Sequence, residues 1–87
     1  TLPENHPHLA SSYHNIAVVY SSVGDYTTAL SYSHKALEMR QKTLPENNPD
    51  LASSYNNIAV VYSIMGDYTT ALSHSHKALE MRQKIQD

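Results

Sequence analysis

The chain has no cysteine, and this absence limits how so short a protein can be stabilised. Among its 87 residues there is no thiol, so disulfide bonds and thiolate zinc sites are excluded. A chain of this size buries only about 60–65% of its unfolded surface. Packing within and between secondary-structure elements must therefore supply most of the stability, and the redox compartment stays undecided.

Long apolar runs and an excess of basic charge are also missing. The longest uninterrupted apolar run covers residues 16–20, far short of the roughly 20 residues that cross a bilayer. No basic and apolar leader opens the chain. The formal charge is −2, with six Lys and Arg against eight Asp and Glu, so the basic surface typical of nucleic-acid binding is absent. We therefore expect neither a membrane nor a nucleic acid as partner.

What the chain does contain is a segment of 42 residues that occurs twice. Residues 1–42 and 43–84 differ at six positions, so 36 of 42 are identical. Self-similarity at such a period is typical of repeat architectures, whose units stack on one another. We interpret 1–42 and 43–87 as two tandem repeats. Because the chain starts at Thr1 and is cut almost at a repeat boundary, we expect a piece of a longer array.

Each repeat predicts two helices joined by a tight turn. We expect first helices over about residues 8–23 and 49–65, and second helices over about 25–42 and 67–85. Between them Gly24 favours the left-handed conformation that ends a helix, and Asp25 is a good N-cap for the next one. The first helix carries one apolar face with a period of 3.6 residues, formed by Leu9, Tyr13, Ile16, Ala17 and Tyr20.

Helix-start signals and a second apolar stripe complete the pattern. Asn48 is a preferred N-cap before Pro49 at the first helical position, and Asp50 complements the positive end of the helix. His6 takes the cap position in the first repeat. The predicted fold class is all-α, with four helices in tandem antiparallel hairpins. The inward stripe of the second helix comprises Tyr26, Ala29, Leu30, Ser33, Ala36, Leu37 and Arg40.

These residues carry a family resemblance. The first repeat has Tyr13, Ile16, Ala17, Tyr20, Gly24, Tyr26, Ala29, Ala36 and Leu37, and the second has Tyr55, Ile58, Ala59, Tyr62, Gly66, Tyr68, Ala71, Ala78 and Leu79. This pattern resembles the signature of the tetratricopeptide repeat. The standard unit has about 34 residues, and the longer unit here is similar to the repeats of kinesin light chains. The resemblance implies a right-handed α-solenoid whose first helices line a concave, peptide-binding groove.

Three features depart from the family pattern. Ala17 and Ala59 stand where glycine is usual, which still permits close helix packing. Ser33 and Ser75 stand where an aromatic residue is common, so we expect one thinner core contact. Glutamine replaces the terminating proline at positions 41 and 83, which lets the second helix run about one turn further.

Beside the buried face of each first helix runs a second stripe, which we call the groove stripe. Asparagine amides donate and accept hydrogen bonds and so match a peptide backbone, while valine and isoleucine hold apolar side chains. The stripe has no Lys or Arg, which disfavours a clamp for carboxylates and leaves the peptide class open. The alternative is a solvated helix face. The groove stripe comprises Ser11, His14, Asn15, Val18 and Ser22, and Ser53, Asn56, Asn57, Val60 and Ile64.

Metal binding and catalysis are weaker hypotheses. His34 with Glu38, and His76 with Glu80, are spaced i, i+4 on a helix, and His6 and His8 could add a further pair. No closed ligand set accompanies them, so we expect neither a metal nor a cofactor. The sequence has no phosphate loop, nucleophile elbow or convergent acid pair, and we expect no enzymatic activity.

The near-identity of the repeats suggests an alternative function. We expect the second helix of the first repeat to pack on the first helix of the second repeat. The last helix of the chain has the same residues at the equivalent positions: Tyr68, Ala71, Leu72, Ala78 and Leu79. A second copy of the chain could cover them by head-to-tail stacking or by exchange of a hairpin. The sequence therefore leaves two functions open, a scaffold that binds peptide segments of other proteins and a structural unit that assembles with its own copies.

Overall fold

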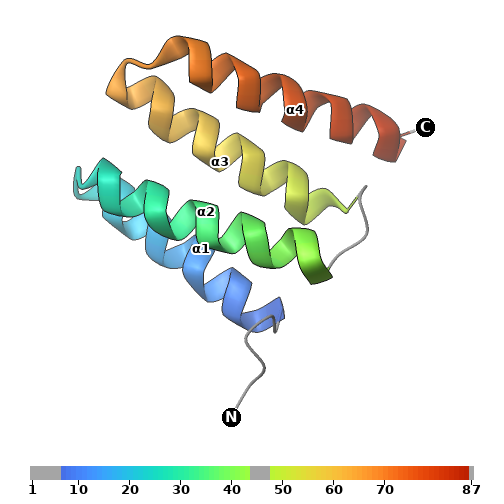
Figure 1. Cartoon of the computed structure of the whole chain (residues 1–87), viewed down its shortest axis with the longest axis horizontal. Coiled ribbons are helices and arrows are strands. Elements are labelled where there is room, and N and C mark those ends of the chain that lie inside the picture. The colour runs from blue at the N-terminus through green and yellow to red at the C-terminus, as the bar shows by residue number, and fades with distance from the viewer. Residues whose placement is uncertain (1–6, 44–47, 87) are drawn as a thin grey trace.

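The computed structural model describes residues 7–43 and 48–86, and four helices occupy these ranges. They are α1 (Pro7–Ser22), α2 (Tyr26–Thr43), α3 (Pro49–Met65) and α4 (Tyr68–Gln86) (Figure 1). Each helix begins and ends within one residue of the range expected from the sequence. The predicted all-α class is confirmed, and no strand occurs in the part of the chain that the structure describes.

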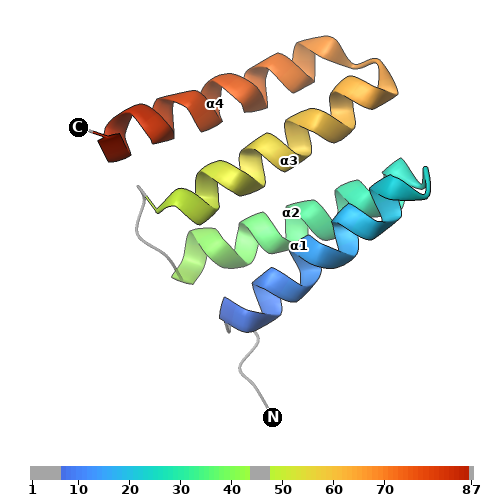
Figure 2. The same cartoon turned by 180° about the vertical axis from the view of Figure 1, so that it is seen from behind.

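The helices lie side by side in chain order. α1 packs on α2, α2 on α3 and α3 on α4, which gives a slab of 37 × 33 × 14 Å. Figure 2 shows the same order from behind, with α1 and α4 at opposite edges of the stack. The two hairpins therefore meet at one contact, between α2 and α3, which we call the junction.

Both hairpin turns have the chemistry that the sequence predicts. Gly24 and Gly66 have φ angles of 88° and 90°, a left-handed conformation that costs glycine little. The Asp25 carboxylate then accepts a hydrogen bond from the Thr28 backbone N–H at 3.3 Å, and Asp67 caps α4 in the same way. The two turns lie at the same end of the molecule (Figure 1).

The predicted cap of α3 is also confirmed. Asn48 has an extended conformation, and its side-chain oxygen accepts from the Asp50 backbone N–H at 2.9 Å. Pro49 occupies the first helical position, where its missing N–H is not needed. The cap expected at His6 lies outside the described residues.

The core is centred on the junction. Within the hairpins, Ala29 and Ala36 of α2 are buried, and so are their counterparts Ala71 and Ala78 of α4, which packs on α3 alone. These small side chains therefore let the two helices of one hairpin approach closely. Burial along α2 follows the predicted inward stripe, and Met39 is an additional buried residue that the stripe did not include. The central cluster consists of Leu37, Leu51, Ala52, Ile58 and Met81.

Identical residues of the two repeats differ sharply in burial. Leu37 of α2 is 7% exposed, whereas its counterpart Leu79 of α4 is 52% exposed. Ile58 of α3 is 0% exposed, but Ile16, which the helical pattern places on the buried face of α1, is 38% exposed. The reason is position in the stack, because α2 and α3 cover each other and no described helix covers the outer sides of α1 and α4.

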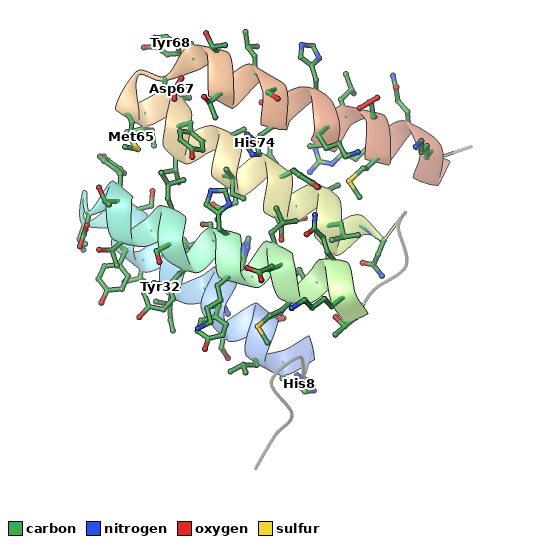
Figure 3. The ribbon with its side chains drawn as sticks, viewed as in Figure 1. His8, Tyr32, Met65, Asp67, Tyr68 and His74 are labelled. Carbon is green, nitrogen blue, oxygen red and sulfur yellow. The ribbon has the colours of Figure 1, made fainter. Side chains whose placement is uncertain are left out.

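Histidine and tyrosine rings from three helices meet beside the junction. His74 of α4 stacks on Tyr62 of α3 with ring centroids 5.7 Å apart, and His34 of α2 lies 6.3 Å from His74. The His74 Nδ1 lies 3.0 Å from the Thr70 carbonyl oxygen. In the first repeat Tyr32 takes the position of His74 (Figure 3). Burial lowers the pKa of His34 below its ordinary value, and the nearby His74 charge lowers it further.

The matched leucines give a first prediction. Leu37→Ala removes a buried side chain from the central cluster, so the free energy of unfolding should fall by about 2–4 kcal/mol. Leu79→Ala removes the same atoms from an exposed site and should cost less than about 1 kcal/mol. Urea unfolding at low protein concentration measures both. Equal losses would show that burial at the junction is not what distinguishes the two repeats.

The lowered pKa of His34 gives a second prediction. The unfolded chain binds a proton at His34 more readily than the folded chain, so protonation favours unfolding. Stability should be full above the ordinary pKa of about 6.5 and should fall as the pH drops through the lowered value. The thermal midpoint, followed by circular dichroism from neutral to mildly acid pH, should therefore decrease. His34→Gln should reduce this dependence, whereas His76→Gln, the matched control on the exposed side of α4, should not.

Candidate functional site

The groove stripe lies half on α1 and half on α3. Eight of its ten residues are exposed, and only His14 and Asn57 are partly buried. Its three large apolar side chains, Val18, Val60 and Ile64, are all exposed. Neighbouring exposed apolar groups with polar residues beside them are typical of interaction surfaces. The stripe is therefore accessible to a ligand over most of its length.

The end of the stripe on α3 borders an open cleft between α3 and α4. Val60 and Ile64 form one wall of the cleft, and Tyr68 and Leu72 belong to α4. The small side chain of Ala59 is buried beneath it. The cleft is lined by Ala59, Val60, Ser63, Ile64, Tyr68, Ala71, Leu72 and Ser75.

The two asparagines at equivalent positions of the stripe have different surroundings. Asn57 Nδ2 donates to Ser33 Oγ at 2.9 Å across the junction, while Asn15 is exposed on α1. Ser33 is buried, so the expected thin contact is instead a polar one. Asn57 keeps one amide hydrogen and its oxygen for other partners, whereas the Asn15 side chain lies open to solvent.

The groove stripe carries no fixed charge. Burial lowers the pKa of His14, the Arg40 charge lowers it further, and the Asp50 charge acts in the opposite direction. A lowered pKa keeps this imidazole neutral at pH 7, so one ring nitrogen donates and the other accepts. The second repeat has Asn56 at the same position, which also offers one donor group and one acceptor.

A set of polar contacts at the junction escaped the sequence analysis. Arg40 was expected on the inward stripe, and it is buried. Its guanidinium donates to Ser54 Oγ at 2.7 Å and to the Asp50 carbonyl oxygen at 3.3 Å, while Gln41 Nε2 donates to the Tyr55 hydroxyl at 3.0 Å. A buried guanidinium needs hydrogen-bond acceptors. An arginine on the inward stripe therefore indicates an acceptor on the helix that packs against it, and here that acceptor is the Ser54 hydroxyl of α3.

Residues 7–43 and 48–86 contain neither a metal-ligand cluster nor a membrane-spanning helix. No three His, Asp or Glu side chains gather closely enough there to hold a metal ion. None of the helices in these ranges is long and apolar enough to cross a bilayer. The proposed ligand pair at His6 and His8 lies partly outside the described residues.

Comparisons with known proteins address the family directly. The family model described as tetratricopeptide repeat matches residues 5–84. Among solved structures, the crystal structure of BtubC (BKLC) from P. vanneervenii, a kinesin light chain-like protein, superposes with a TM-score of 0.87. It is 31% identical in sequence and the match covers 95% of this chain. No curated protein matches the sequence.

The match to BtubC extends over 34% of that protein's chain, so the present chain spans about a third of its length. Members of the tetratricopeptide family generally bind other proteins and typically act as scaffolds without enzymatic activity. The signature residues, the hairpin architecture and the family match agree over both repeats. The chain belongs to the tetratricopeptide repeat family, is similar to a kinesin light chain-like protein, and has the architecture of a protein-interaction scaffold.

Proposed function

We propose that the chain binds extended peptide segments of other proteins along the groove stripe of α1 and α3. The observation that carries the proposal is the exposure of Val18 and Val60 at equivalent positions of the two first helices. Each is flanked by exposed polar groups, Asn15 on α1 and Asn56 on α3. Each first helix thus presents one exposed apolar contact and one exposed amide, three residues apart on α1 and four residues apart on α3.

The composition of the stripe indicates the chemistry of the peptide. The Asn15 and Asn56 amides can each donate to and accept from a peptide backbone, and Val60 and Ile64 can contact apolar side chains of the ligand. No Lys or Arg belongs to the stripe, so it offers no Lys or Arg cation to pair with an acidic peptide or a terminal carboxylate. The proposed ligand is therefore a neutral segment with apolar side chains.

Paired substitutions test the groove stripe. Val18→Ser with Val60→Ser removes both matched apolar contacts and should weaken binding of a neutral, apolar peptide at least about fivefold, since 1 kcal/mol corresponds to roughly that factor. Fluorescence anisotropy against a labelled peptide array measures the affinity. Ser73→Ala, an exposed change on α4, is the control and should bind as the unchanged chain does. Equal affinity for the paired variant would place the peptide elsewhere.

A second proposed function is assembly of the chain with its own copies. The outer sides of α1 and α4 expose apolar side chains that include Ile16, Val19, Tyr68, Leu72 and Leu79. Exposed apolar groups gathered on one face favour association. Head-to-tail stacking and exchange of a hairpin between chains would both cover them.

Sedimentation tests this second function. If the outer sides of α1 and α4 associate, the weight-average mass should rise with protein concentration up to about 1 mM, the range of weak association. Stacked copies should separate rapidly on dilution, whereas chains that have exchanged a hairpin should separate slowly because the hairpins must first detach. A single monomeric species across the whole range would contradict assembly by either route.

A further inference from the structure

We infer that two copies join head to tail, with the outer face of α4 in one copy on the outer face of α1 in the next. This inference rests on the second proposed function and names the surfaces that meet. The tail face consists of Tyr68, Leu72, Ser75, Leu79, Arg82 and Gln83 on α4. The head face consists of Ser12, Tyr13, Asn15, Ile16 and Val19 on α1.

The two faces are the open counterparts of the junction. Every tail-face residue is identical to the α2 residue 42 positions earlier, and every head-face residue is identical to the α3 residue 42 positions later. None of the six differences between the repeats falls on either face. The surfaces that pack together within the chain are therefore both present again, unpaired, at its two edges.

Burial shows how much the junction covers. Val61 of α3 is 1% exposed against α2, whereas Val19, its counterpart on the head face, is 61% exposed. On the other side Tyr26 and Leu30 of α2 are partly buried, while Tyr68 and Leu72 of the tail face are exposed. A second copy placed as α3 is placed on α2 would cover these same side chains.

Hydrogen bonds define the register of the contact. Three side-chain hydrogen bonds cross the junction: Asn57 to Ser33, Arg40 to Ser54, and Gln41 to Tyr55. The same residue types occur at the equivalent positions of α1 and α4. Asn15 and Ser75 are exposed, as are Arg82 and Ser12. The Ser12 hydroxyl donates to the His8 carbonyl oxygen at 3.1 Å, which leaves its oxygen able to accept. The expected pairs between copies are Asn15 with Ser75, Ser12 with Arg82, and Tyr13 with Gln83.

The same pairs decide between head-to-tail and symmetric association. Arg82 and Gln83 donate from the tail face, and their acceptors in the junction pattern, Ser12 and Tyr13, lie on the head face. Two tail faces placed together could not reproduce these pairs, because Ser12 and Tyr13 belong to the head face. The contact is therefore heterologous, and each added copy presents another free tail face, so growth is open-ended.

Two blocked variants test the inference. Leu72→Glu with Leu79→Glu places negative charges on the tail face, and Ile16→Glu with Val19→Glu places charges of the same sign on the head face, so the two blocked faces also repel each other. All four side chains are exposed, so the fold should persist, which circular dichroism checks. Each variant alone should stay monomeric, because it keeps only one working face. An equal mixture should form a dimer with one copy of each variant, whereas the unchanged chain should form a series of larger species.

Sedimentation velocity with light scattering separates the outcomes. A control with Ser31→Glu and Ser73→Glu, two exposed positions that belong to neither face, should associate as the unchanged chain does. The head-to-tail inference is overturned if the unchanged chain associates but the mixture stays monomeric. It is also overturned if either blocked variant associates alone. In both cases the chain would assemble by another route. If the unchanged chain never associates, both the inference and the second proposed function fail.

Discussion

The structure depends on one contact, the junction between α2 and α3. Leu37 of α2 and Ile58 of α3 belong to the buried cluster there. The Arg40 guanidinium is buried in the same contact and donates to Ser54 Oγ and a carbonyl oxygen. A buried charge is costly unless its hydrogen bonds are satisfied, so these acceptors fix the register of one hairpin on the other. Apolar burial supplies the attraction, and the polar pairs specify the alignment.

The features that the sequence predicts well are local ones. Helical periodicity, Gly24 with Asp25, and Asn48 before Pro49 each act within a few residues, and the helix ends follow from them. Periodicity places Ile16 on the buried face, yet Ile16 is 38% exposed. Its exposure could not be predicted locally, because it depends on which helix lies beside α1. The Asn57 contact with Ser33 is a similar case. Helical spacing places Asn56 and Asn57 on adjoining faces, and only packing shows which of them reaches the next helix.

The family explains what kind of protein this is, and the side chains define what is left for a ligand. Tetratricopeptide repeats present protein-interaction surfaces, and the chain matches this family over both repeats. Residues used by the junction have fewer groups left for a peptide, as Asn57 illustrates with its bond to Ser33. The remaining exposed positions, including Val18 and Val60, carry no charge. We therefore propose the groove stripe as the site for neutral, apolar segments and the open edges of the stack as the site for another copy.

The most direct test of this account uses the absence of cysteine, which allows single thiols to be placed at will. Chains with Asn15→Cys and with Ser75→Cys would be mixed and treated with bifunctional thiol reagents of graded length. A Ser33→Cys, Asn57→Cys chain would serve as the internal reference, because those residues are bonded across the junction. The account predicts cross-links between the two different chains at the spacer length that links the reference pair. Equal cross-linking among Ser75→Cys chains alone, or none between the two variants, would contradict it.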